Sequence, residues 1–243
     1  VRGQDELWLK ENMINIGISR LPSDWEFVAW FDADISFLSP DIIKESVQAL
    51  QHHMFIQPFQ TAIDLGPNGE TLQVHNSFCW SYWMHKPFGK DYSIWHPGYA
   101  WCARREALEA VGGMIDIGIL GSGDRHMATA LLGKVEASYN HGVHKNYSRV
   151  LQEWQTKAER HIKRDIGFCS GTLLHHFHGA KRFRGYKERW LILVEHQFNP
   201  ETDLKKDTQG LWQLEVHSPR QIALRDDIRR YFRSRNEDSR DLE

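Results

Sequence analysis

The stretch Trp25-Glu26-Phe27-Val28-Ala29-Trp30-Phe31-Asp32-Ala33-Asp34-Ile35 joins an apolar run to two carboxylates one residue apart. Large apolar side chains in an unbroken run are typical of a strand that is buried on both faces. Because burying an unpaired carboxylate costs several kcal/mol, we expect Asp32 and Asp34 at the carboxyl end of that strand. Ligands of α/β proteins bind at such strand ends, so the stretch predicts an α/β fold with a site there.

The spacing of Asp32 and Asp34 has two interpretations. Carboxylates placed in this way can hold a hard divalent cation, which in turn holds a phosphate group. The alternative is a turn in which an aspartate caps the next helix, because aspartate is common in turns. These residues alone leave both interpretations open.

The composition limits the classes of protein that fit. The 243 residues are enough for one large or two small domains, and a net charge of -2 argues against a protein that is basic throughout. Cys79, Cys102 and Cys169 have no pairing or metal-binding spacing, which indicates reduced thiols and a cytoplasmic protein. No apolar run is long enough to predict a membrane span.

The remaining sequence alternates between helical and extended patterns. We expect helices over 6–18, 40–50, 104–111, 127–132, 151–165, 188–195 and 222–235, and strands over 54–59, 99–103 and 167–174. Residues 64–70 are rich in turn formers and predict a loop, and residues 200–210 predict a polar linker. Residues 75–101 hold many aromatic side chains, which indicate either a long loop that lines a site or a satellite aromatic core.

Two later segments carry residues suited to catalysis. Gly121-Ser122-Gly123-Asp124 precedes a helix, so Asp124 is either a helix cap or a base beside a bound hydroxyl group. His176-Phe177-His178-Gly179-Ala180-Lys181-Arg182 follows a predicted strand. A histidine from it, with Asp32 and Asp34, would complete a site for Mn²⁺ or Mg²⁺, and its basic side chains would neutralise a leaving diphosphate.

These segments, in this order, resemble the GT-A fold glycosyltransferases, which use nucleotide-sugar donors. The resemblance rests on four matches. Val28 to Asp34 resembles the strand and Asp-x-Asp motif, and Trp95 to Gly113 resembles the following strand and helix. Gly121 to Asp124 resembles the segment that carries the base of inverting members, and His176 to Lys181 resembles the His-(Phe/Tyr)-x-Gly-x-x-Lys segment of glycogenin-like members, with one fewer residue before the lysine.

The resemblance implies an open mixed sheet flanked by helices and an inverting, metal-dependent hexosyl transfer from a UDP-sugar. It assigns the metal to Asp34, to Asp32 and to His176, with His178 as the substitute for His176. It assigns the sugar donor to Asp32, His96, Pro97, Gly98, Gly179 and Lys181. It assigns the base to Asp124, which would activate the acceptor hydroxyl.

The chain departs from the family in two places. Gly123 stands where many members have glutamate, which affects the contact with the acceptor. The family also places a strand, a helix and a strand before the first helix expected here, so we expect the N-terminal nucleotide-binding strands to be missing or truncated. We assign residues 1–195 to the catalytic domain and 196–243 to a linker and a basic amphipathic helix.

The acceptor is open at this point. Basic and aromatic residues alternate over 181–190, and residues 225–235 form a basic helix, a pattern suited to nucleic acid. Phage enzymes of this type glycosylate hydroxymethylated bases in DNA, which would place this protein in the host cytoplasm. The alternatives are a solvated face with an unrelated acceptor, a non-catalytic module that binds sugar or nucleic acid, and a two-metal phosphodiesterase.

Overall fold

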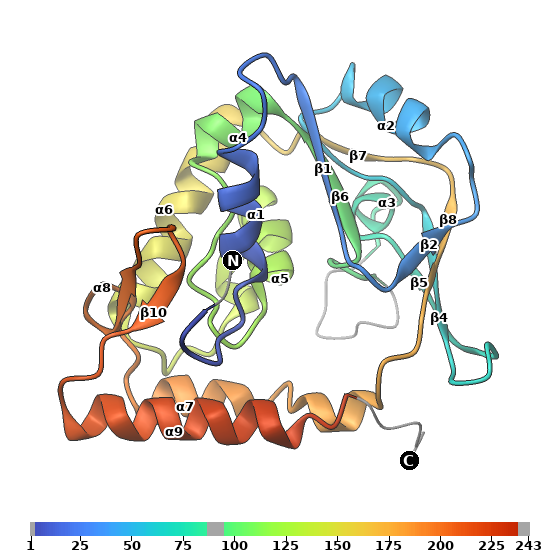
Figure 1. Cartoon of the computed structure of the whole chain (residues 1–243). Coiled ribbons are helices and arrows are strands. Elements are labelled where there is room, and N and C mark those ends of the chain that lie inside the picture. The colour runs from blue at the N-terminus through green and yellow to red at the C-terminus, as the bar shows by residue number, and fades with distance from the viewer. Residues whose placement is uncertain (1–2, 87–94, 238–243) are drawn as a thin grey trace.

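The computed structural model describes residues 3–86 and 95–237 (Figure 1). The helices are α1 (Lys10–Ile18), α2 (Ile42–Leu50), α3 (Phe78–Trp83), α4 (Arg105–Val111), α5 (Gly123–Leu131), α6 (Lys145–His161), α7 (Glu188–Glu195), α8 (Pro200–Asp203) and α9 (Pro219–Ser234), with 3₁₀ turns η1 (Val135–Ser138) and η2 (Lys181–Arg184). The strands are β1 (Phe27–Phe31), β2 (Ile35–Phe37), β3 (Phe55–Gln57), β4 (Thr61–Leu65), β5 (Thr71–Asn76), β6 (Ala100–Arg104), β7 (Ile166–Phe168), β8 (Thr172–His175), β9 (Leu204–Lys206) and β10 (Trp212–Leu214).

Within the described residues, most strands belong to two mixed four-stranded sheets. The first has the order β1-β6-β3-β7, in which β3 and β7 are parallel and the other neighbours antiparallel. The second has the order β2-β8-β4-β5, in which β4 and β8 are parallel. The expectation of an α/β protein with open mixed sheets flanked by helices is therefore confirmed.

Helices cover both faces of the first sheet, and successive side chains of its strands point alternately to the two faces. Trp101 and Ala103 of β6 belong to the large core that α4, α5 and α6 cover, whereas Cys102 between them belongs to a smaller core with Ile42 and Leu50 of α2. This period of two is the pattern expected of a central strand. The site described below lies where this sheet meets the second one.

The prediction that β1 is buried on both faces is wrong. Among the described strands β1 stands at the edge of its sheet, and of its residues only Trp30 is buried, while Phe31 is 38% exposed. The fully covered strands are β3 and most of β6. An apolar run alone did not distinguish an edge strand from a central one.

Three segments differ from their predicted structure. Residues 167–174 are not one strand, because β7 ends in the first sheet and β8 begins in the second. The predicted linker over 200–210 contains α8 and β9, which pairs with β10. The aromatic region contains α3, and Phe78, Trp95 and Trp101 belong to the main core, while residues 87–94 lie outside the described part.

Helix α9 confirms the predicted C-terminal amphipathic helix and packs beside α7 along one edge of the molecule (Figure 1). Its apolar face contributes Leu224, Ile228 and Tyr231 to the large core. The C-terminal segment therefore shares the core of the rest of the chain. Over residues 3–86 and 95–237, no helix combines the length and the apolar character needed to cross a bilayer.

Candidate functional site

Asp32 and Asp34 lie where the chain passes from the first sheet to the second. They follow β1 directly, as predicted, and β2 begins at Ile35. The amide of Asp32 donates to the carbonyl of Tyr99 at 2.8 Å, and the carbonyl of Asp34 accepts from the amide of His176 at 2.8 Å. The turn is thus fixed to both sheets, which sets the direction of both carboxylates.

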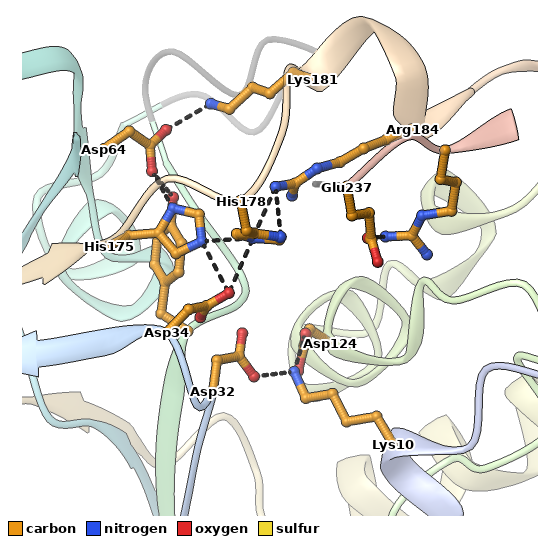
Figure 2. A network of polar contacts seen from close by, with 12 residues as sticks. Lys10, Asp32, Asp34, Asp64, Asp124, His175, His178, Lys181, Arg184 and Glu237 are labelled. Atoms are coloured by element: carbon orange, nitrogen blue, oxygen red, sulfur yellow. Dashed lines mark hydrogen bonds and ion pairs between the residues drawn. The ribbon is translucent and has the colours of Figure 1, made fainter. Parts of the chain in front are cut away.

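Asp34 meets two histidines from the end of β8 (Figure 2). Its Oδ2 atom lies 2.9 Å from Nε2 of His178 and 3.6 Å from Nε2 of His175. One ligand atom from each residue lies within 4.8 Å of the others, which is a spacing that can hold a metal ion. Burial acts to raise the pKa of Asp34, but the hydrogen bonds from His175 and His178 outweigh it and hold that pKa well below its usual range.

His176 does not join this group. Its Nε2 atom lies 2.9 Å from Oγ of Ser36, and its side chain is exposed. Successive side chains of an extended chain point to opposite faces, so His175 and His176 cannot both turn toward Asp34. The structure therefore corrects the expected set: His178 lies beside Asp34 and His175 joins it, whereas His176 faces away and Asp32 contacts Lys10 instead of joining this group.

Asp64 contacts the ring nitrogen of His175 that does not face Asp34. The two residues are paired across the parallel strands β4 and β8, and Nδ1 of His175 lies 2.8 Å from Oδ1 of Asp64. Asp64 is 3% exposed and also accepts from Tyr99 at 2.7 Å, from Lys181 at 2.6 Å and from the ring of His75 at 2.9 Å. Burial opposes ionisation, but these contacts prevail and keep the pKa of Asp64 well below its usual range.

This role of Asp64 escaped the sequence analysis, which placed it in a loop. It is a residue of β4, and only the pairing of β4 with β8 brings it to His175, 111 positions away. A single aspartate before Gly-Pro resembles ordinary turn chemistry. The missed signal is an aspartate on the strand that neighbours the histidines.

Lys181 and Gly179 lie near the histidines, at the rim of a hollow of about 200 Å³. Lys181 donates to Asp64 and, at 3.1 Å, to Oε1 of Gln73. Gly179 has a φ of +92°, and a Cβ atom there would lie 3.0 Å from Cα of Glu237. Glycine is required by both the backbone angle and the close approach of the C-terminal segment.

Arg184 also lines the hollow, and its Nη2 atom lies 2.8 Å from Nε2 of His178. The hollow therefore combines two cations, Lys181 and Arg184, with the two histidines that approach Asp34. Such a lining suits an anionic group bound next to a cation held by those histidines.

The segment His96-Pro97-Gly98 lies on the other side of Tyr99. The buried amide of Gln57 donates to the carbonyls of His96 and Gly98, and the ring of His96 stacks on Tyr99 at 3.9 Å. A Cβ atom on Gly98 would lie 3.4 Å from Oδ2 of Asp124. The structure thus brings this predicted segment next to the candidate base.

Lys10 joins the two remaining candidates, Asp32 and Asp124. Its Nζ atom lies 2.6 Å from Oδ1 of Asp32 and 2.9 Å from Oδ2 of Asp124 (Figure 2). Burial acts to lower the pKa of Lys10, but the charges of Asp124 and Asp32 outweigh it and raise that pKa. Lys10 was not predicted, because a lysine at the start of a surface helix usually lies in solvent.

Two carboxylate oxygens of the site are buried without a hydrogen-bond partner among the described residues: Oδ1 of Asp34 and Oδ1 of Asp124. A buried carboxylate oxygen normally has a partner, so these two atoms are candidates for contact with a ligand atom. For Asp34, the carboxylate and two imidazoles form a donor set that fits a divalent metal ion such as Mn²⁺.

Two residues close to Asp64 and Asp124 have a strained backbone. Tyr99 has a φ of +76° and Ser122 a φ of +84°, in the left-handed region that side-chain-bearing residues rarely adopt. Tyr99 is fixed by His96 and Asp64, and Ser122 by a hydrogen bond of 2.6 Å from Arg189. Strain of this kind is concentrated at functional sites.

Comparisons of the chain with protein-family models, with curated proteins and with solved structures find no match. The site must therefore be interpreted from its own geometry.

Proposed function

We propose that the protein is a metal-dependent glycosyltransferase that moves a sugar from a nucleotide-sugar donor to an acceptor hydroxyl group with inversion. The observation that carries this proposal is a pair of buried oxygens, Asp34 Oδ1 and Asp124 Oδ1, that have no hydrogen-bond partner in the part of the chain that the structure describes. One suits a metal ion and the other suits a hydroxyl group that gives up its proton. The resemblance to GT-A fold glycosyltransferases agrees with this division of labour.

Asp34, His175 and His178 would hold the metal ion. Their two imidazoles favour Mn²⁺ over Mg²⁺, which prefers oxygen ligands. When bound, the ion supplies positive charge that stabilises the leaving diphosphate. Asp64 fixes the ring of His175 through Nδ1, which leaves Nε2 facing Asp34.

Lys181 and Arg184 would contact the sugar-donor phosphates. Both line the hollow beside His175 and His178. For Lys181 this requires that a phosphate replace or share its present contact with Asp64. A UDP-sugar is the donor that the resemblance implies, and Gly98 and Asp32 would lie next to its sugar.

Asp124 would act as the general base. Its Oδ2 atom is held by Lys10, and its Oδ1 atom would accept the proton of the acceptor hydroxyl. The hydroxyl oxygen then forms a bond to the anomeric carbon, while the bond from that carbon to the diphosphate oxygen breaks with its electron pair. A positioned base typically contributes about 10²- to 10⁴-fold to the rate.

DNA is a second candidate for the acceptor. The packing of α7 beside α9 brings together the two basic stretches, and Tyr231 of α9 donates to the carbonyl of Arg184 at 2.9 Å. A duplex on this face would be held through phosphate contacts, so its binding should weaken steeply with salt. Salt-independent or absent binding of duplex DNA would exclude it as the acceptor.

Ligand binding tests the sugar-donor assignment directly. Thermal unfolding with a panel of nucleotide sugars, with and without Mn²⁺, should show stabilisation by at least one of them that requires the metal ion. Stabilisation that does not depend on Mn²⁺, or no stabilisation by any nucleotide sugar, would argue against the proposal.

The three buried free cysteines fit the reducing cytoplasm, where we place the reaction.

A further inference from the structure

Helix α1 buries polar residues at its start. Glu11 and Asn12 are its buried residues, whereas a helix on a protein surface ordinarily buries an apolar stripe. Asn12 donates to Asp116 at 3.2 Å, and Asn15 both donates to the carbonyl of Met114 and accepts from its amide. These contacts align the first turn of α1 with the segment that leads into α5.

The alignment places Lys10 between two carboxylates. Its ammonium group bridges Oδ1 of Asp32 and Oδ2 of Asp124, and between 21% and 26% of each of the three side chains is exposed. The Oδ1 atom of Asp124 is left without a partner among the described residues. Lys10 thus fixes one oxygen of Asp124 and leaves the other for a ligand.

The next residue, Glu11, fills the space beside Gly123. A Cβ atom on Gly123 would lie 2.3 Å from Cδ and 2.4 Å from Oε1 of Glu11, which is closer than real contacts allow. Gly123 lies in the first turn of α5 and is not among the glycines with positive φ, so its backbone does not require glycine. A side chain at position 123 would instead meet the carboxyl group of Glu11, which would have to move.

The charge of Glu11 also fits this position. Burial, and next the negative charge of Asp124, raise the pKa of Glu11 to about 8. At neutral pH the group therefore keeps its proton for most of the time. It fills space beside Asp124 without adding a third negative charge to Asp32 and Asp124.

We propose that Lys10 and Glu11 are positioning residues for Asp124. Lys10 holds its Oδ2 atom so that Oδ1 faces the acceptor hydroxyl, and Glu11 occupies the space beside Gly123, the residue before Asp124. The role in catalysis rests on the proposed function, whereas the two contacts can be tested without it.

Unfolding experiments test the contact between Glu11 and Gly123. Alanine is the better helix former, so without the contact Gly123→Ala should raise the melting temperature. We expect it to lower the melting temperature, and we expect Glu11→Ala combined with Gly123→Ala to unfold at a higher temperature than the sum of the single changes gives. Additive effects, or a higher melting temperature for Gly123→Ala, would overturn this part of the proposal.

A second double-mutant cycle tests the contact between Lys10 and Asp124. Lys10→Met keeps the aliphatic stem and removes the charge, and Lys44→Met on the exposed side of α2 is the matched control. Because Lys10→Met leaves Asp32 and Asp124 facing each other, we expect it to lower the melting temperature more than Lys44→Met does. Asp124→Asn should recover part of that loss, and no coupling in this cycle would overturn the contact.

Kinetics of sugar transfer test the positioning role. We expect Lys10→Met to lower kcat at least tenfold with little change in KM for the sugar donor, and Lys10→Arg to recover part of the rate. In the Asp124→Asn background, Lys10→Met should cause no further loss, because Lys10 acts through Asp124. A full rate for Lys10→Met beside an inactive Asp124→Asn would overturn the inference and leave the proposed function standing, whereas full activity of Asp124→Asn would contradict the proposed function itself.

Discussion

The Nδ1 atom of His175 lies 2.8 Å from Oδ1 of Asp64, across the parallel pairing of β8 with β4. This contact fixes the imidazole so that its Nε2 atom faces Asp34 and His178. Carboxylates that hold a histidine in this way tune the affinity of many metal sites. The contact makes Asp64 the residue that would orient His175 in the proposed metal site.

Replacement of Asp64 should weaken metal binding without removing a ligand. We expect Asp64→Asn to lower the affinity for Mn²⁺ by about 10- to 100-fold in calorimetry, because the amide holds the imidazole less firmly. Asp203→Asn is the matched control: Asp203 is fully buried and paired with Arg220, and it belongs to α8, which lies on the opposite side of the molecule from β4 (Figure 1). Equal Mn²⁺ affinities for wild type and Asp64→Asn would contradict the role of Asp64.

The neighbouring histidines should differ sharply in metal binding. His178 approaches Asp34, whereas His176 is exposed and contacts Ser36. We therefore expect His178→Ala to reduce Mn²⁺ affinity by at least tenfold and His176→Ala to leave it unchanged. If His176→Ala lowered the Mn²⁺ affinity and His178→Ala did not, His176 would be the ligand, as the sequence resemblance implied, and His178 would be rejected.

Loss of the candidate base should separate binding from turnover. Asp124→Asn keeps the shape of the side chain and removes its capacity to accept a proton, so we expect kcat to fall by about 10²- to 10⁴-fold. The KM for the sugar donor should change little, because the proposed function assigns Asp124 to the acceptor hydroxyl. Steady-state kinetics provides the measurement, and a loss confined to KM would assign Asp124 to binding instead.

The pH dependence of stability should reveal Glu11. Its pKa is raised from 4.5 to about 8 in the folded state, so between these values the folded chain binds a proton that the unfolded chain has released. The contribution of Glu11 to stability is therefore complete below pH 4.5 and is lost as the pH rises toward 8. The free energy of unfolding should fall by roughly 1.4 kcal/mol per pH unit from this group alone.

Urea unfolding of the wild type and of Glu11→Gln from pH 5 to pH 8 isolates that effect. Glutamine cannot ionise, so the wild type should lose stability relative to the variant as the pH rises. If the free energies of unfolding of the two proteins changed with pH in parallel, Glu11 would be ionised in the folded state, and its pKa would not be raised.

The sequence predicted those parts of the site that are local in the chain. Asp32 and Asp34 end an apolar run, and His178 and Asp124 stand in short motifs, so their positions follow from neighbouring residues. His175, Asp64 and Lys10 could not be predicted in this way. Asp64 and Lys10 reach their partners across 111 and 114 positions, through strand pairing and through the docking of α1.

In the fold, too, local sequence patterns predicted the helices but not the pairing of the strands. Helices α4, α7 and α9 lie close to where their patterns predicted them, and Gly112 ends α4 in the left-handed conformation common at helix ends. The edge position of β1 and the separation of β7 from β8 depend on which strands pair. Pairing is decided by residues far apart in the sequence, and local patterns do not encode it.

The most direct measurement is the release of nucleoside diphosphate from a panel of nucleotide sugars by the wild type and by Asp34→Ala, with Mn²⁺ and with a chelator. The proposed function predicts release by the wild type with Mn²⁺, and none with the chelator or with Asp34→Ala. Release that survives both the chelator and the loss of Asp34, or no release from any nucleotide sugar with Mn²⁺ and with candidate acceptors including duplex DNA, would contradict it.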